Sequence, residues 1–216
     1  MEKIFPGVFR VKVEGRDEIA TKGLVPGKVY GEHLVGEYRV WNPNRSKLAA
    51  YIIQGGKQFP FKKDSKVLYL GAGNGTTVSH ISDMVSEGVV YCIEFAPRSM
   101  RDLMEVCGKR DNMVPILADA NFPENYPDFV GECDIVYQDV AQPNQGAIFV
   151  LNCERFLKKG GHGFLMIKTQ SIDVTLAPKK IVEKIVSALP YKILEQVDLG
   201  NYQKDHTAIV ISAESS

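Results

Sequence analysis

The amino-acid sequence predicts an α/β protein with a mainly parallel sheet of about seven strands and a small β-rich module at its N-terminus. From Ser65 onward, short β-branched runs alternate with longer segments of helical period, which is the pattern of βαβ units. Before about residue 56 the chain has frequent turn signals and alternating apolar and polar residues, which are typical of hairpins. We therefore expect residues 1–56 to form the β-rich module and residues 57–216 the α/β domain.

Short alternating runs between turns predict the strands of the N-terminal module. Phe9, Val11 and Val13 share one side of the first run, with basic residues between them. Tyr38 and Val40 share one side of a second run. This period of two is that of half-buried strands, and Pro-Gly and Glu-Gly pairs supply the turns that join them.

Apolar runs and helical stripes predict the elements of the α/β domain. Its expected strands are residues 67–70, 89–93, 114–117, 135–137, 164–167, 191–197 and 207–211. Residues at helical spacing predict three core-facing stripes, which are Val78, Ile81 and Val85, then Ile148, Leu151 and Phe156, and finally Ile181, Ile185 and Leu189. Pro178 and Pro190 bound the last helix, and the alternation predicts helices on both faces of the sheet.

The composition limits the function classes. Of the 216 residues, 44% are hydrophobic and 24% are charged, as in ordinary soluble globular proteins. Lys+Arg and Asp+Glu both count 26, so the net charge is zero. A protein that binds RNA without partners usually has more basic than acidic residues. Neutrality therefore leaves two interpretations open: a small-molecule substrate, or partner proteins that do most of the RNA binding.

Cysteine, histidine and hydropathy patterns argue against several other classes. Cys92, Cys107, Cys133 and Cys153 have no CxxC spacing, and most lie in or beside apolar runs, so we expect buried reduced thiols. The histidines lack metal-ligand spacing, so no metal site is expected. No leader-like pattern opens the chain, and no apolar run approaches the ~18 residues of a membrane span. These patterns predict a cytoplasmic protein without a membrane partner.

The strongest local signal is a glycine-rich turn after the first strand of the α/β domain. Residues 67–77 read VLYLGAGNGTT, a buried strand followed by alternate glycines and the start of a helix. Glycines permit a tight turn and let the backbone contact a ligand, and the helix N-terminus adds free N–H groups for an anion. Many doubly wound folds have such a turn for packing alone, so the turn is weak evidence of function by itself.

Three acidic residues strengthen the prediction of a nucleoside pocket. Glu94 ends the second strand, where a carboxylate can accept both hydroxyls of a ribose, while Asp119 and Asp139 follow the third and fourth strands. Ligands of open α/β sheets bind outside the carboxyl ends of the strands, so these acids describe one pocket. The loop is G-x-G-x-G rather than the dinucleotide fingerprint, which favours S-adenosylmethionine over NAD. Tyr69 stands where many methyltransferases carry an acid.

Four blocks of the chain closely resemble the fibrillarin family. They are WNPNRSKLAA at 41–50, TTVSH at 76–80, EF and RS within 94–99, and DVAQP at 139–143. The first and last blocks are far more specific than any glycine loop, and the likeness extends over nearly the whole chain. The Gly/Arg-rich arm of eukaryotic members is missing, so the chain looks like an archaeal fibrillarin-like protein.

The resemblance implies a class I methyltransferase fold and a guide-directed enzyme. Similar proteins transfer a methyl group from S-adenosylmethionine to ribose 2′-hydroxyls of rRNA, and in archaea also of tRNA. They act in box C/D ribonucleoproteins, docked on a Nop-domain scaffold protein that holds the guide RNA together with a kink-turn-binding protein. Such partners would account for the neutral charge. The expected cofactor-binding residues are Gly71, Ala72, Gly73, Thr76, Thr77, Glu94, Phe95, Asp119, Ala120, Asp139 and Gln142.

The family's Lys-Asp-Lys-His group for 2′-O-methyl transfer has matching positions in this chain. They are Lys47, Asp139, Lys168 and His206. Methyl transfer is an in-line displacement, so alignment supplies much of the rate, and the ribose hydroxyl must lose its proton around the transition state. Lys168 is our candidate to orient or deprotonate this hydroxyl, or to stabilise developing oxyanion charge. Lys47 would supply positive charge or hold a phosphate, and His206 would complete the hydrogen-bond network.

Two other functions stay open. A small-molecule methyltransferase could use the same pocket, and the neutral charge would suit it. A scaffold subunit could bind the cofactor and mainly organise an RNA–protein particle. The presence of both lysines together with Asp139 and His206 argues against an inactive scaffold.

Overall fold

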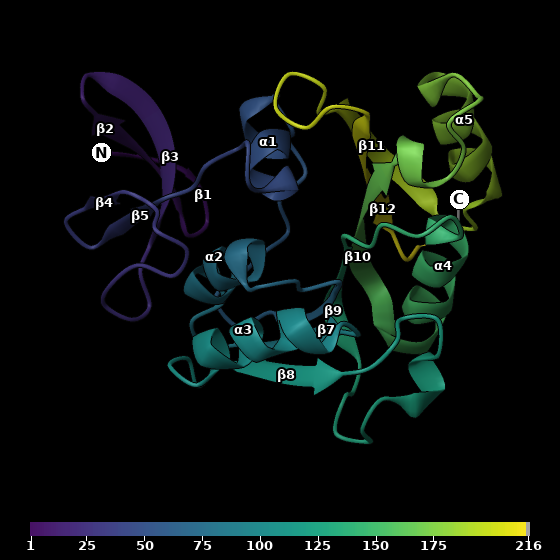
Figure 1. Ribbon diagram of the computed structural model, residues 1–216, viewed down its shortest axis with the longest axis horizontal. Coiled ribbons are helices and arrows are strands. Elements are labelled where there is room, and N and C mark those ends of the chain that lie inside the picture. The colour runs from purple at the N-terminus through teal and green to yellow at the C-terminus, as the bar shows by residue number, and fades with distance from the viewer. Residues whose placement is uncertain (215–216) are drawn as a thin grey trace.

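A computed structural model describes residues 1–214, within which the chain forms two β-sheets joined by one apolar cluster (Figure 1). The N-terminal sheet is antiparallel and has the strand order β1-β2-β3-β5-β4. Its strands are β1 (Glu2–Phe5), β2 (Val8–Val13), β3 (Arg16–Lys22), β4 (Leu34–Val35) and β5 (Tyr38–Val40). The predicted β-rich N-terminal module is therefore confirmed, whereas its boundary at residue 56 stays a prediction.

The larger sheet has the strand order β11-β12-β10-β9-β6-β7-β8, with seven strands in the described part of the chain. Its strands are β6 (Lys66–Leu70), β7 (Val89–Glu94), β8 (Met113–Leu117), β9 (Cys133–Gln138), β10 (Leu157–Lys168), β11 (Lys192–Asp198) and β12 (His206–Ser212). Neighbours from β10 to β8 are parallel, and β12 is antiparallel to both β10 and β11. This is the predicted seven-stranded, mainly parallel sheet.

Helices cover both faces of the larger sheet (Figure 1). They are α1 (Lys47–Ile53), α2 (Thr76–Met84), α3 (Pro97–Cys107), α4 (Gln145–Phe156) and α5 (Pro178–Ala188), with short 3₁₀ turns at Pro123–Asn125 and Thr169–Ser171. Val67 and Tyr69 of β6 pack in the cluster that includes α1–α3, and Leu68 and Leu70 pack in the cluster that includes α4 and α5. Successive strand residues point to opposite faces, which is why a continuous apolar run serves both layers.

The helical stripes were predicted with unequal success. Val78, Ile81 and Val85 are all fully buried, as expected. In α4, however, Leu151 is 45% exposed, so its assignment to the core was wrong. The buried side of α4 instead includes Phe149 and Asn152 beside Ile148 and Phe156, and Leu151 lies away from this side. In α5, Ile181 is buried, and Ile185 and Leu189 are half-buried. The sequence patterns predicted neither α1 nor α3.

A buried ionic network attaches the N-terminal module to α2. The Arg39 guanidinium donates to Glu32 at 2.6 Å and to Asp83 of α2 at 2.7 Å, and Arg110 donates to the other Asp83 oxygen at 2.7 Å. These four side chains are at most 1% exposed. Because each charge is paired, the network is tolerated, and loss of one partner would leave an uncompensated buried charge.

Other expectations concern cysteines, membranes and metals. Within residues 1–214, Cys92, Cys107, Cys133 and Cys153 are buried and free, as predicted. No helix in this range combines the length and hydropathy that crossing a bilayer requires. No cluster of three or more His, Cys, Asp or Glu side chains in the described residues has a geometry suited to a metal ion.

Candidate active site

The glycine turn and the end of β9 are in close backbone contact. The amides of Gly71 and Ala72 both donate to the Ile93 carbonyl, at 2.9 and 3.0 Å, and the Asp139 amide donates to the Leu70 carbonyl at 2.9 Å. Gly71 has a φ of 79°, and a Cβ at this position would lie 2.6 Å from the Asp139 carbonyl oxygen. Only glycine permits this approach, which places the Asp139 side chain beside the turn.

Glu94 links the end of β7 to the same turn. One of its carboxylate oxygens accepts the Gly73 amide and the other accepts the Ala96 amide, both at 2.8 Å. The side chain is 7% exposed, so its orientation is fixed by these bonds. A carboxylate oxygen has more than one lone pair, and each oxygen therefore remains able to accept a ligand hydroxyl.

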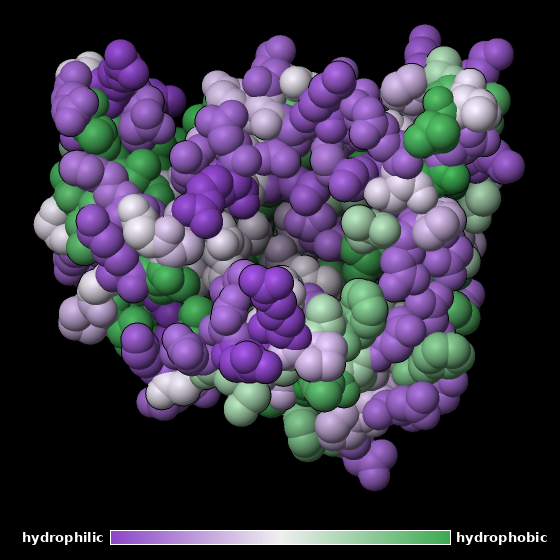
Figure 2. Space-filling model, viewed as in Figure 1, coloured by the Kyte–Doolittle hydropathy of each residue, from purple (hydrophilic) through white to green (hydrophobic). Residues whose placement is uncertain are grey.

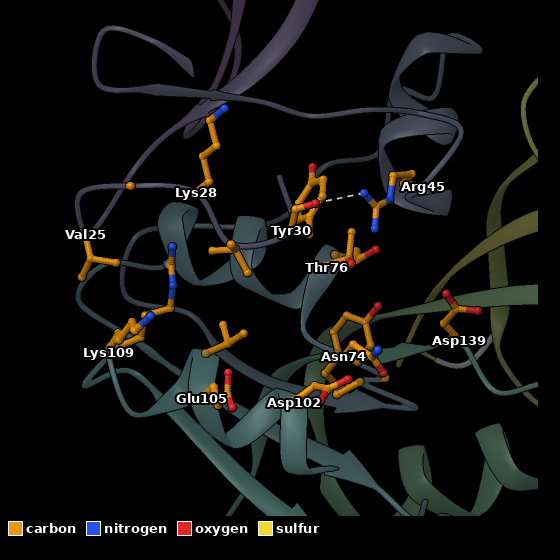
Figure 3. Close-up of a pocket in the computed structure, with 18 of the residues that line it drawn as sticks. Val25, Lys28, Tyr30, Arg45, Asn74, Thr76, Asp102, Glu105, Lys109 and Asp139 are labelled. Carbon is orange, nitrogen blue, oxygen red and sulfur yellow. Dashed lines mark hydrogen bonds between the residues drawn. The ribbon is translucent and has the colours of Figure 1, made fainter. Parts of the chain in front are cut away.

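Two cavities lined by described residues border the glycine turn. The smaller, of about 360 Å³, is lined by Gly71, Gly73, Ile93, Glu94, Phe95, Ala118, Ala120, Asp139, Val140, Ala141 and Gln142. The larger, of about 580 Å³, extends from the turn towards the N-terminal module and α3 (Figure 3). Both cavities share Gly71, Gly73 and Asp139. Figure 2 shows this face hollowed near its centre, with hydrophilic residues above and below the hollow and more hydrophobic residues on its right side.

The predicted cofactor residues divide between the two cavities. Those that line the smaller cavity are Gly71, Gly73, Glu94, Phe95, Ala120, Asp139 and Gln142, and Ala72, Thr76 and Thr77 line the larger one. Asp119 lines neither cavity. Its Oδ1 accepts the Asn121 amide at 2.9 Å and the Asn121 side chain at 2.8 Å. The Asn121 side chain also donates to Gln142 at 2.9 Å, so Asp119 positions Gln142 through a residue that the sequence reading missed.

Lys47 and Asp139 form an ion pair at the junction of the two cavities. The Lys47 Nζ lies 2.7 Å from one carboxylate oxygen of Asp139 and 3.0 Å from the other, and each side chain is 19% exposed. Lys47 is the first residue of α1, whose N-cap Ser46 accepts the Ala49 amide at 3.3 Å. Thr77 donates to the same Ser46 hydroxyl at 3.0 Å, so the first turns of α1 and α2 are tied together.

Lys168 and His206 are cross-strand partners at the same edge of the sheet. Lys168 ends β10 and His206 begins β12, and their Cα atoms are paired in the antiparallel register. The side-chain amide of Gln145, which is fully buried, accepts the Lys168 N–H at 2.9 Å and donates to its carbonyl at 3.1 Å. Gln145, which the sequence reading missed, therefore fixes the backbone of Lys168.

The protonation state of His206 follows from its contacts. Its Nδ1 lies 2.7 Å from the Lys204 carbonyl oxygen, which only accepts, so Nδ1 carries the proton and Nε2 has a free lone pair. Burial lowers the pKa of His206, and the nearby Lys47 lowers it further while Asp139 opposes this. Lys168 also lowers this pKa. Neither Lys168 nor His206 lines the two cavities at the glycine turn, and His206 instead lines a separate cavity together with Lys204.

The N-terminal module contributes residues to the larger cavity that no motif indicated. The segment 25–30 forms one wall, and Arg45 lies beside it (Figure 3). The Arg45 Nη1 donates to the Tyr30 carbonyl at 3.0 Å. Arg45 lies within the block at 41–50, but its contact with Tyr30 depends on how the module folds.

The doubly wound sheet, the glycine turn and the acid at the end of β7 define a nucleoside site on a class I methyltransferase fold. The chain belongs to the fibrillarin family, whose sequence profile matches residues 1–215. A Methanocaldococcus jannaschii relative, named fibrillarin-like rRNA/tRNA 2′-O-methyltransferase, is 49% identical over 219 residues, covering 97% of this chain and 95% of the relative. These findings confirm the resemblance predicted from the four sequence blocks.

Two solved structures have the same fold at high identity. Aeropyrum pernix fibrillarin, solved with natively bound S-adenosyl-L-methionine, is 46% identical with a TM-score of 0.87, covering 95% of this chain and 94% of that one. A chain in a fibrillarin/Nop5p complex is 37% identical with a TM-score of 0.92, covering 97% of this chain and 99% of that one.

Proposed function

We propose that this protein transfers a methyl group from S-adenosylmethionine to ribose 2′-hydroxyls of rRNA, and of tRNA, as the catalytic subunit of a guide-directed box C/D ribonucleoprotein. The observation that carries the proposal is the Lys47–Asp139 ion pair beside the glycine turn, with Lys168 and His206 paired across the ends of β10 and β12 in the same sheet. A charged cluster of this kind next to a nucleoside pocket suits activation of a weak hydroxyl nucleophile.

The residues of the two cavities fit S-adenosylmethionine. Glu94, held by two backbone amides, can accept the ribose hydroxyls, and Phe95, which is 61% exposed, offers an aromatic surface in the smaller cavity. The N-terminus of α2 has no side-chain cap among the described residues, so its free N–H groups suit a carboxylate. A Cβ on Gly73 would meet nothing within 4 Å, which leaves open space between the two cavities.

The chain's own residues would carry out distinct parts of the reaction. Bound S-adenosylmethionine supplies a methyl group on positively charged sulfur, ready for in-line displacement. Asp139, fixed by Lys47, accepts a hydrogen bond from the 2′-hydroxyl and aligns it. Lys168 stabilises the negative charge that develops on the hydroxyl oxygen. The neutral His206 takes the released proton at Nε2, directly or through one water molecule.

Partner proteins supply most of the RNA binding in this proposal. The zero net charge argues against tight RNA binding by the chain alone. The fibrillarin/Nop5p complex supports a Nop-domain scaffold protein as one partner. A box C/D guide RNA, a kink-turn-binding protein and the substrate rRNA or tRNA complete the proposed particle.

Tritiated methyl transfer to a target RNA tests the function. The reaction is run with the chain alone and with the scaffold protein, the kink-turn-binding protein and a matching guide. We expect incorporation only in the complete particle, and none when the target 2′-hydroxyl is replaced by hydrogen. Incorporation into the 2′-deoxy target would overturn the 2′-O assignment. No transfer under any condition, despite cofactor binding, would favour the small-molecule or scaffold alternatives.

A further inference from the structure

Arg45 is an exposed cation at the rim of the larger cavity. Its Nη1 donates to the Tyr30 carbonyl at 3.0 Å, and its guanidinium carbon lies 4.7 Å from the centre of the Tyr30 ring (Figure 3). None of the ion pairs formed within residues 1–214 includes Arg45. The Tyr30 contact uses one of the five N–H donors of the guanidinium, and this leaves it able to bind an anion.

The residue that supports Arg45 is itself held by the buried network. The Tyr30 hydroxyl lies 2.7 Å from His80 Nε2, and the His80 ring stacks on Trp41 with centroids 4.8 Å apart. The Tyr30 amide donates to Glu32, the partner of Arg39, at 2.8 Å. Arg45 is thus stacked on a rigid base, and a pre-positioned side chain loses less conformational entropy when it binds a ligand.

Arg45 also has a defined position relative to the catalytic cluster. It precedes Lys47 by two residues and lines the same cavity as Asp139, the partner of Lys47. The acidic residues Asp102 and Glu105 come from α3, across the cavity from Arg45 (Figure 3). In RNA, the carbon that bears the 2′-hydroxyl is bonded to the carbon that bears the 3′-phosphate. A ribose aligned by Asp139 would therefore place its flanking phosphates in or beside the cavity that Arg45 also lines.

We propose that Arg45 binds a backbone phosphate of the target RNA strand next to the reacting ribose and so sets the register of that strand in the site. This inference rests on the proposed function. An arginine fork binds phosphate oxygens in a defined direction, and phosphate contacts position a strand without reading its sequence. The carboxylate of the cofactor is the weaker candidate, because the uncapped N-terminus of α2 is already available to it.

The test combines protein variants with a neutralised phosphate in the complete particle. Arg45→Gln is compared with Arg16→Gln, an exposed arginine of β3 outside the ion pairs described within residues 1–214. Target RNAs carry a single methylphosphonate at either phosphate that flanks the target nucleotide. In the Arg16→Gln control, we expect the methylphosphonate at one of the two flanking positions to lower kcat/KM about tenfold to a hundredfold relative to unmodified RNA. Arg45→Gln should show this loss with unmodified RNA and no further loss with the modified strand.

Two further readouts separate phosphate binding from a structural role. The slope of log(kcat/KM) against log[salt] should become shallower by about 0.7 to 0.9 in Arg45→Gln, as one phosphate contact is lost. Arg45→Lys should recover part of the loss, because it keeps the charge without the fork. The S-adenosylmethionine affinity of Arg45→Gln should equal that of Arg16→Gln.

Several outcomes would overturn the inference. Additive losses from Arg45→Gln and from each methylphosphonate would show that Arg45 and the phosphate do not interact. A large loss of S-adenosylmethionine affinity, measured by calorimetry, would assign Arg45 to the cofactor instead. If the unmodified protein methylated no RNA at all, the proposed function would be wrong and this inference would fall with it. The first two outcomes, by contrast, contradict only the role of Arg45 and leave the proposed function standing.

Discussion

Lys47 and Asp139 are 92 residues apart in the chain, yet the Lys47 Nζ lies 2.7 Å from an oxygen of the Asp139 carboxylate. Lys47 begins α1 and Asp139 follows β9, so the pair exists only because α1 packs against the sheet. Each side chain is 19% exposed, so water screens the pair less than it screens a surface salt bridge. The pair therefore holds the carboxylate in one orientation at the junction of the cavities.

Asp139→Asn should abolish most of the methyl transfer while leaving the fold intact. The amide keeps the shape of the carboxylate but loses the charge that holds Lys47 and accepts the substrate hydroxyl. We expect the single-turnover rate in the complete particle to fall by about 10²- to 10³-fold. The exposed Asp111→Asn serves as the matched control and should keep the full rate. An unchanged rate for Asp139→Asn would contradict the assignment of Asp139 to the methyl-transfer reaction.

The pH dependence of the reaction should report His206. Its pKa is lowered by burial and by Lys47, below the ordinary histidine value of 6.5, and the proposed base works in the neutral form. The rate should therefore stay constant as the pH falls to 6.5 and should decline only at lower pH, as His206 becomes protonated. His206→Asn should lower the rate by about 10²- to 10⁴-fold and remove this decline. A decline that persists in the variant would point to another group.

Glu94→Gln should weaken cofactor binding and destabilise the glycine turn. Both carboxylate oxygens accept backbone N–H groups, and the amide nitrogen of glutamine would face one of these donors. Because the side chain is 7% exposed, an unsatisfied donor here should cost about 1–3 kcal/mol. Calorimetry with S-adenosylmethionine and denaturant unfolding measure the two effects. Equal affinity in the variant and in the unchanged protein would contradict a role in cofactor binding.

The stability of the protein should fall in mild acid because of His80. Burial and the neighbours Arg39 and Arg110 hold the pKa of His80 well below 6.5 in the folded state. The unfolded chain takes up protons below pH 6.5 that the folded state does not, so the free energy of unfolding decreases as the pH falls below this value. One such group contributes a slope of up to about 1.4 kcal/mol per pH unit.

The measurement for His80 is denaturant unfolding of the isolated chain between pH 7 and 5. His80→Gln should give a shallower dependence, and the exposed His33→Gln should leave it unchanged. The dependence should not disappear completely, because burial also lowers the pKa values of His162 and His206. An identical slope in His80→Gln would mean that the buried network does not exclude a proton from this ring.

Several features of the site could be predicted because they depend on local rules. A glycine turn after a buried strand and acids at strand ends are properties of short segments. Parallel strands end at the same edge of a sheet, so Glu94 and Asp139 line the same cavity. The apolar runs likewise predicted all seven strands of the larger sheet within residues 1–214.

Other features were missed for identifiable reasons. The helix α1 has only seven residues, KLAAYII, too short and too uniformly apolar to show a helical period. In α3, Met100, Leu103 and Cys107 have the spacing of a core stripe, and this signal could have been found. Leu151 was misplaced because its spacing from Ile148 fits a helical stripe, whereas the side of α4 that faces the sheet includes Phe149 and Asn152.

By itself, the sequence determined the order and type of most elements, the glycine turn and the residue types that a methyltransferase site needs. Only the tertiary structure decided which of these residues touch: Lys47 with Asp139, Gln145 with the backbone of Lys168, and Arg45 with Tyr30. Periodicity records which side of an element is buried, because burial follows from hydrophobicity at each position. Contacts between polar groups distant in the chain depend on how the elements pack, and sequence spacing carries no record of that packing.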